Sequence, residues 1–299
     1  MFLRATAKIN LCLDVLRKRP DGYHDVRMVM QMVGMYDRLH LYAVKRSDPD
    51  SGPGRITLSV NLPYIPADEN NLAVRAARLL MDEKGVTDDL EIKLGKFIPV
   101  AAGLAGGSSD AAMTMIGVNR LFHLGFSDEE LMERGKKIGA DVPYCIMRGT
   151  ALSEGIGEIL TPLPDLPECG ILLSKPSCPV STKEVYGSLR ANELGADDHP
   201  DVDLMLEALK RGDLHGICDA KCMSNVLEGV TAPNHPLIGQ LEKEMVSLGA
   251  LNAVMSGSGP TVFGIFENID AATRACREIR IRYPQVRSFA TRPVKREEP

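Results

Sequence analysis

The sequence predicts an α+β protein built from two domains. Its 299 residues are enough for two hydrophobic cores of ordinary size. In the first half, segments with the alternating pattern of strands and segments with helical periodicity follow one another in irregular order. In the second half, apart from a helical insertion, the order is β-α-β-β-α-β, the split arrangement of ferredoxin-like domains.

The strands of the first half are recognised by alternation of apolar and polar residues. Residues 7–15 alternate in this way and predict a half-buried strand. A turn follows at residues 20–22, because Pro20 fixes one backbone dihedral and Gly22 accepts a positive φ. Further strands are expected at residues 28–36, 39–44, 56–60 and 90–94.

Two helices of the first half have start signals in the sequence. Asn71 is expected to cap a helix that stops near Gly85. Ser127 and Glu130 have the spacing of a capping box, which predicts a helix that begins there and runs toward Gly139.

The expected joint between the domains is the segment 161–167, which holds three prolines in seven residues. We therefore predict an amino-terminal domain of residues 1–163 and a carboxy-terminal domain of residues 164–299. The second domain is expected to contain a strand at 171–174, helical material at 182–228, a helix at 236–248, strands at 252–255 and 261–266, a helix after residue 270 and a strand at 286–291.

Composition narrows the class of protein. A net charge of −5 argues against a nucleic-acid binder, which would normally carry a basic face. The first residues lack the apolar run of a secretory signal, and no uncharged stretch approaches the roughly 20 residues of a membrane span. Seven scattered cysteines suit a reducing compartment. We expect a soluble, cytoplasmic protein with small-molecule partners, and the sequence leaves open whether it is a monomer or a homodimer.

One cysteine grouping resembles a metal site. His215, Cys218 and Cys222 have a spacing that would place them on one helix face. No fourth ligand lies nearby at a familiar spacing, and small packing residues are the commoner explanation. We therefore expect no protein-bound metal at these residues.

The most informative segment is a glycine-rich loop that follows a predicted strand and leads into an apolar helix. Glycines remove side chains that would block a phosphate, serines offer hydroxyls, and a helix start presents unpaired amides with a favourable dipole. A loop needed only for tight packing is the alternative, but three glycines and two serines near one helix start favour phosphate binding. The expected nucleotide-binding residues of the loop are Pro99, Gly103, Leu104, Ala105, Gly106, Gly107, Ser108 and Ser109.

The loop is not a Walker A motif, because no lysine follows the glycines. It resembles the second motif of the GHMP kinases, with Asp110 as a small departure from the family pattern. Residues 5–11 and 255–263 resemble the first and third motifs of that family, in the same order. The resemblance implies an ATP-dependent small-molecule kinase with a ribosomal-S5-domain-2-like amino-terminal domain, a ferredoxin-like carboxy-terminal domain and an active site between them.

Within the family, the sequence is most similar to the branch that phosphorylates a cytidylyl sugar alcohol. The segments that carry this similarity are 8–11, 18–24, 138–143 and 155–158, together with Gln31. The similarity implies transfer of the γ-phosphoryl group of ATP to the 2-hydroxyl of a cytidine-diphosphate-linked methylerythritol. The alternatives are a GHMP kinase for another alcohol, such as homoserine or mevalonate, and a nucleotide-binding protein of this fold without catalytic activity.

The resemblance assigns the chemistry to two residues. Phosphoryl transfer needs alignment, charge neutralisation and a group that accepts the hydroxyl proton. Asp141 is the expected base, Lys8 the expected cation, and Asn10 is expected to orient the substrate. Without the resemblance, Asp141 reads as a helix cap, Lys8 as a solvent-facing lysine and Asn10 as a partner of backbone groups.

The resemblance also assigns the two ends of the site. At the cytidine end, Tyr23 and Tyr186 are expected to stack on cytosine while His24 reads its edge; each tyrosine taken alone reads as an ordinary half-buried aromatic. At the ATP end, Asn71 and Lys96 are expected near adenine and ribose, against the alternatives of a helix cap and a surface lysine.

Two further expectations concern the loop at residues 257–259 and the metal. The loop is expected either to approach the ligands or simply to form a tight turn between strands. Mg²⁺ is expected with ATP. The sequence offers no defensible carboxylate ligand, so Ser108 or Ser109, the phosphates and water are the expected ligands.

Overall fold

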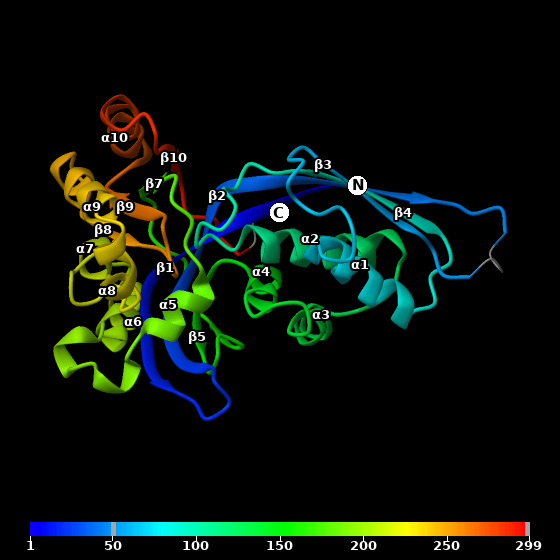
Figure 1. The fold of residues 1–299 in the computed structure, drawn as a ribbon, viewed down its shortest axis with the longest axis horizontal. Coiled ribbons are helices and arrows are strands. Elements are labelled where there is room, and N and C mark those ends of the chain that lie inside the picture. Colours follow the sequence, from blue (N-terminus) through cyan, green and yellow to red (C-terminus); the bar gives the residue numbers. More distant parts are fainter. Residues whose placement is uncertain (49–51, 297–299) are drawn as a thin grey trace.

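A computed structural model describes residues 1–48 and 52–296 of the chain. It shows an α+β fold with two sheets, as predicted (Figure 1). The elongated sheet of the first half carries its helices on one side, and the sheet of the second half lies at the other end of the molecule among the carboxy-terminal helices. None of the helices in the described ranges is both long and apolar enough to cross a membrane.

The first sheet has the order β3-β4-β2-β5-β6, with β1 paired to β2. Its strands are β1 (Phe2–Lys18), β2 (His24–Val44), β3 (Ile56–Val60), β4 (Asp89–Gly95), β5 (Thr150–Glu154) and β6 (Ile159–Pro162). The helices that accompany it are α1 (Leu72–Glu83), α2 (Gly106–Leu121), α3 (Asp128–Gly135) and α4 (Val142–Met147). Buried apolar residues of α1 and α2 pack against those of β2 and β4 in the core beneath this sheet.

The first sheet corrects the prediction at two places. Residues 28–36 and 39–44 are not two strands but parts of the single strand β2. The strand continues through Asp37 because the buried carboxylate accepts hydrogen bonds from the amides of Phe97 and Ile98, at 2.5 and 2.8 Å. Strands β5 and β6 were not predicted, and β6 includes the first two residues of the expected joint.

The second sheet has the order β10-β7-β9-β8, with antiparallel pairs throughout. Its elements are β7 (Gly170–Lys175), α9 (Leu237–Ser247), β8 (Asn252–Met255), β9 (Val262–Phe266), α10 (Ile269–Arg282) and β10 (Arg287–Thr291). This is the predicted β-α-β-β-α-β arrangement. The helix expected after residue 270 begins earlier, because Asn268 caps it by accepting the Ala271 amide at 3.0 Å.

The insertion between β7 and α9 is a series of short pieces. They are α5 (Thr182–Ser188), η1 (Ala191–Glu193), η2 (Ala196–Asp198), α6 (Val202–Arg211), α7 (Leu214–Ile217), α8 (Glu228–Thr231) and η3 (Ala232–Asn234). Helix α7 ends before Cys218, so His215, Cys218 and Cys222 do not share a helix face as their spacing suggested. His215 instead pairs with Glu267 at 2.8 Å.

The predicted helix starts are confirmed. Asn71 accepts the amide of Ala73 at 3.0 Å. Ser127 and Glu130 form the reciprocal capping box. Helix α3 ends at Gly135, four residues before the predicted Gly139.

The two halves are joined by backbone hydrogen bonds. The amide of Leu13 in β1 donates to the Ser224 carbonyl at 3.0 Å, and the amide of Val226 donates to the Leu13 carbonyl at 3.1 Å. On β2, the Gly34 amide donates to the Arg292 carbonyl at 3.0 Å. The boundary predicted between residues 163 and 164 falls in the segment that joins β6 to β7 and stays a prediction.

Candidate active site

A cavity of about 950 Å³ lies where the two halves meet. Its size is in the range of small-molecule sites, roughly 300–1,000 Å³. Segments far apart in the sequence line it: β1 and β2, the glycine-rich loop, the residues before α4, the start of α5 and the loop between β8 and β9. Every predicted site residue except Ser109 is part of its wall: Lys8, Asn10, Tyr23, His24, Asn71, Lys96, Pro99, Gly103, Leu104, Ala105, Gly106, Gly107, Ser108, Asp141 and Tyr186.

The glycine-rich loop is held from two sides. The Lys8 amide of β1 donates to the Leu104 carbonyl at 3.2 Å. From the second half, the Ser256 hydroxyl donates to the Gly103 carbonyl at 3.1 Å. Gly103 has a φ of +74°, and a Cβ there would lie 2.1 Å from the Ser256 carbonyl oxygen. Gly103 is therefore required by the close approach of the loop between β8 and β9.

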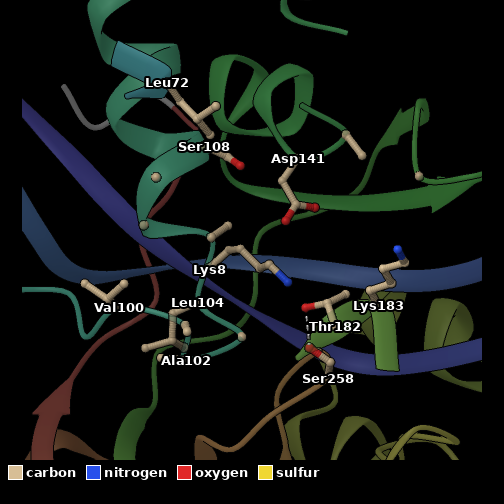
Figure 2. Close-up of a pocket in the computed structure, with 18 of the residues that line it drawn as sticks. Lys8, Leu72, Val100, Ala102, Leu104, Ser108, Asp141, Thr182, Lys183 and Ser258 are labelled. Carbon is tan, nitrogen blue, oxygen red and sulfur yellow. Dashed lines mark hydrogen bonds between the residues drawn. The ribbon is translucent and has the colours of Figure 1, made fainter. Parts of the chain in front are cut away.

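The loop leads directly into the amino terminus of α2. Ala105, the residue before the helix, is held in the left-handed region at a φ of +53°. The first amides of a helix have no partner within it, and the helix dipole adds positive character there. Gly107 is exposed at this end, and Figure 2 shows the Ser108 hydroxyl directed into the cavity. The arrangement suits an anion.

Ser109 does not share this position. Its side chain is 1% exposed, and its hydroxyl has no hydrogen-bond partner within the described residues. Its amide donates to the Ala105 carbonyl at 2.9 Å. Helix geometry turns Ser109 toward the core, so its position does not support the predicted contact with a nucleotide or metal.

Lys8 and Asp141 face the same part of the cavity from different elements. Lys8 is 5% exposed, so the alternative of a solvent-facing lysine is wrong. Its ammonium donates to Asn10 Oδ1 at 2.7 Å, which fixes the direction of both side chains. Asp141 stands at the first position before α4, but its side chain makes no capping hydrogen bond. Figure 2 shows the Asp141 carboxylate directed toward the side of the cavity that holds the Lys8 ammonium.

An aromatic pair lies at another part of the wall. The rings of His24 and Tyr186 have centroids 5.3 Å apart and are tilted by 48°. His24 Nε2 is buried without a partner in the described chain, and burial, with a smaller effect of the Lys18 charge, lowers the pKa of the imidazole. The ring is therefore neutral near pH 7 and offers one donor and one acceptor. Tyr23 is 61% exposed at the rim.

The two residues expected near adenine and ribose are both occupied by protein contacts. Asn71 caps α1 and also donates to the Pro66 carbonyl at 2.9 Å. Lys96 is buried and donates to Asp37 and to Asp110, so the alternative of a surface lysine is wrong. Both residues still line the cavity, although the polar groups of the Asn71 side chain already form hydrogen bonds to Pro66 and Ala73.

Two wall residues at the start of α5, Thr182 and Lys183, were not predicted as site residues, whereas Ser258 lies in the 257–259 loop for which an approach to the ligands was one of the two expectations. Thr182 and Ser258 are joined by a hydrogen bond of 2.8 Å between their hydroxyls (Figure 2). Lys183 follows Thr182 and also lines the cavity. In the sequence, Thr182 and Lys183 are close to Tyr186, and Ser258 is part of the third motif. No local pattern indicates that these two segments meet.

The part of the chain that the structure describes holds no carboxylate cluster of the kind that binds a metal. Across residues 1–48 and 52–296, no group of three or more His, Cys, Asp or Glu side chains is arranged to hold a metal ion. Among the predicted ligands, the Ser108 hydroxyl is the one on the cavity wall.

Comparison with known proteins agrees with this geometry. Residues 71–149 match the model of the GHMP kinases N terminal domain, and residues 205–285 match GHMP kinases C terminal. The 4-diphosphocytidyl-2-C-methyl-D-erythritol kinase of Lachnoclostridium phytofermentans is 50% identical over 97% of this chain and 96% of its own length. Its counterpart in Lachnospira eligens is 50% identical over 92% of each chain.

A solved structure is also similar over the whole chain. The crystal structure of a 4-(cytidine 5'-diphospho)-2C-methyl-D-erythritol kinase superposes with a TM-score of 0.80 at 33% identity, covering 98% of this chain and 99% of its own. The matches span both halves and include the segments that carry the cavity. The chain belongs to the GHMP kinases and, among them, to the family of the 4-diphosphocytidyl-2-C-methyl-D-erythritol kinases.

Proposed function

We propose that this ATP-dependent kinase transfers the γ-phosphoryl group of ATP to the 2-hydroxyl of 4-(cytidine 5'-diphospho)-2-C-methyl-D-erythritol, a step toward isoprenoid precursors. The observation that carries the proposal is one cavity with three kinds of wall. The first is the amino terminus of α2, which suits a phosphate. The second holds Lys8 and Asp141, whose side chains face the same part of the cavity. The third is the ring pair of Tyr186 and the neutral imidazole of His24.

The phosphates of ATP lie at the glycine-rich loop. Gly106 and Gly107 allow the backbone to approach them, and the free amides of α2 donate to their oxygens. The Ser108 hydroxyl adds a donor from the cavity wall. This end of the cavity holds the γ-phosphoryl group in line with the acceptor hydroxyl, which is the main requirement of phosphoryl transfer.

Asp141 accepts the proton of the 2-hydroxyl. The hydroxyl oxygen then forms a bond to the γ-phosphorus while the bond from that phosphorus to the β–γ bridging oxygen breaks, and ADP leaves. Lys8 stabilises the negative charge that spreads over the transferring group. Asn10 holds Lys8 in place, since its Oδ1 accepts the ammonium hydrogen bond at 2.7 Å.

The cytidine end is recognised by rings. Tyr186 and the exposed Tyr23 stack on cytosine, and His24 reads the edge of the base through its unpartnered Nε2. A neutral imidazole suits cytosine, whose edge presents both donors and acceptors.

Mg²⁺ accompanies ATP in this proposal. When bound, it neutralises phosphate charge. Of the ligands that Mg²⁺ needs, the protein supplies the Ser108 hydroxyl on the cavity wall, and the phosphates and water would supply the others.

The test is an ATP-consumption assay with the cytidylyl substrate, and with homoserine or mevalonate in its place. We expect ADP to form with the cytidylyl substrate alone, and phosphorus NMR to show a phosphomonoester on the 2-oxygen. Phosphorylation of homoserine or mevalonate at a comparable rate would support the first alternative. ATP binding without turnover of any of these alcohols would support the non-catalytic alternative.

A further inference from the structure

The loop between β8 and β9 touches two parts of the candidate active site at once. A Cβ at Gly257 would lie 3.5 Å from Asn10 Oδ1 and 3.3 Å from the Gly103 carbonyl oxygen. Asn10 is the residue that accepts the Lys8 ammonium, and Gly103 belongs to the glycine-rich loop. The position of this loop therefore bears both on the direction of Lys8 and on the place of the glycine-rich loop.

The buried side chain of Asn225 holds the loop between β8 and β9 from the protein side. Its Nδ2 donates to the Met255 carbonyl at 2.8 Å and to the Gly257 carbonyl at 2.7 Å. Its Oδ1 accepts the amide of Leu227 at 3.0 Å. The opposite orientation of the amide would set its oxygen against two carbonyl oxygens, so the donors are assigned by their partners. Because a buried carbonyl without a partner costs free energy, these bonds fix the path of the loop.

The backbone at Asn225 is attached to β1. The Leu13 amide donates to the Ser224 carbonyl at 3.0 Å, and the Val226 amide donates to the Leu13 carbonyl at 3.1 Å. Leu13 and Asn225 thus form a parallel bridge. Strand β1 also carries the proposed catalytic lysine. One residue therefore ties the strand of this lysine, through its backbone, to the loop between β8 and β9, through its side chain.

We propose that Asn225 is a positioning residue for phosphoryl transfer, which keeps the loop between β8 and β9 in register with Asn10 and with the glycine-rich loop. Among the described residues, those that line the cavity do not include Asn225, so it acts through the loop and not by contact with a ligand. The inference rests on the proposed function, because it requires Lys8 and Asn10 to act on the transferring group. A displacement of about 1 Å at such groups can lower a rate roughly 100-fold.

Asn225→Ala tests the proposal by removing both donated hydrogen bonds. We expect kcat with the cytidylyl substrate to fall roughly 10- to 100-fold, because the reacting groups lose their alignment. The KM values for both substrates should stay within about threefold of the wild-type values, since the cavity wall itself is unchanged. Steady-state kinetics, run well below the Tm of every variant, measure these constants.

Asn119→Ala is the matched control for a purely structural effect. Asn119 of α2 donates to the Phe126 carbonyl at 2.8 Å and accepts the Phe126 amide at 3.0 Å, and it lies outside the described cavity wall. It should lower Tm, as Asn225→Ala does, but leave kcat unchanged. A fall of kcat confined to Asn225→Ala separates positioning from stability.

A double-mutant cycle tests whether Asn225 acts through Asn10. If it does, the variant that carries both Asn10→Ala and Asn225→Ala should lose much less kcat than the product of the two single losses. Losses that multiply would overturn this route of action.

The remaining outcomes separate the inference from the proposed function. A folded Asn225→Ala enzyme with the wild-type kcat, or with a change in KM alone, would overturn the role of Asn225 and leave the kinase proposal standing. Absence of wild-type turnover of the cytidylyl alcohol would instead overturn the proposed function. If Asn225→Ala does not fold, Asn225→Asp replaces it, because aspartate keeps the shape and the acceptor for the Leu227 amide. Failure of both variants to fold would overturn the inference in favour of a purely structural role.

Discussion

The ring centroids of His24 and Tyr186 lie 5.3 Å apart. His24 begins β2 and Tyr186 lies in α5, so the two residues are 162 positions apart in the sequence, counted from 24 to 186. The contact joins the first sheet to the helical insertion of the second half. The two rings are tilted by 48° to each other and form a partly polar aromatic part of the cavity wall, where we propose that the nucleobase binds. This pairing makes the proposed cytidine end of the cavity the most direct place to test substrate specificity.

Tyr186→Ala should raise the KM for the cytidylyl substrate roughly 5- to 150-fold, because one stacking face contributes on the order of 1–3 kcal/mol. The KM for ATP should change little. Steady-state kinetics with each substrate varied in turn measure both values. Tyr42→Ala, at an exposed tyrosine of β2 outside the cavity, is the control. An equal loss for both substrates would contradict stacking by Tyr186.

Asp141→Asn should lower kcat by at least about 100-fold while both ligands still bind, since general bases contribute about 100- to 10,000-fold. Lys8→Met should also lower kcat, because it removes positive charge from the transferring group. The double variant should lose much less than the product of the single losses, as residues that act together do.

Lys93→Met, at an exposed lysine of β4, serves as the control for removal of a lysine charge. Single-turnover measurements separate the chemical step from product release. An Asp141→Asn enzyme that keeps more than about a tenth of normal turnover would refute the role of Asp141 as base.

Gly107→Val should weaken ATP binding while the fold persists. A Cβ at Gly107 meets nothing closer than Leu72 Cδ1 at 3.6 Å, so the added side chain fits the protein but occupies the side where phosphates approach. Gly103→Ala is the contrasting variant, because it forces a positive φ on alanine and a clash with the Ser256 carbonyl. It should lower Tm as well. Calorimetry beside a thermal melt distinguishes them, and unchanged ATP affinity in folded Gly107→Val would contradict phosphate binding there.

Glu242 should make the protein less stable as pH rises. Burial, together with the Glu228 charge, raises the pKa of Glu242 to about 9 from an ordinary value of 4.5, so the folded state binds its proton more tightly than the unfolded state. Stability from this proton is complete below about pH 4.5 and is lost as pH rises through about 9.

Urea unfolding at pH 6 and pH 9 checks this expectation. The free energy of unfolding of the wild-type protein should fall between pH 6 and pH 9, and Glu242→Gln should make this fall smaller by roughly 1–3 kcal/mol. The expected difference is smaller than the full pKa shift implies, because the side chain is partly solvated. Asp110, whose pKa burial also raises, contributes in the same direction to both proteins, so their difference isolates Glu242. Equal losses in the two proteins would count against the buried carboxyl as the cause.

Features that depend on neighbouring residues were predictable from the sequence. The caps at Asn71 and Ser127 need only local spacing, and both are found as predicted. The apolar helix expected after the glycine-rich loop is also found, as α2. The succession of strands and helices in the second half also followed from the sequence pattern.

Features that depend on tertiary contact were not predictable. Lys96 was expected near adenine or at the surface, but its partner Asp37 lies 59 positions away, and nothing in the local sequence signals that pairing. The same Asp37 is the reason that β2 was predicted as two strands, since a charged residue usually marks the end of a strand. Here the amides of Phe97 and Ile98 donate hydrogen bonds to its carboxylate, so that it can be buried within the strand. Ser109 has the local pattern of a phosphate ligand, and only helix packing turns it inward.

The hydrogen bonds between Leu13 of β1 and the backbone at Ser224 and Val226 have a consequence for the integrity of the molecule. Strand β1 belongs to the first sheet and also forms backbone hydrogen bonds with the segment around residues 224–226 of the second half. After cleavage between residues 161 and 167, we therefore expect the two fragments to remain associated and to unfold in a single thermal transition. Exchange of either half between relatives would have to preserve these hydrogen bonds.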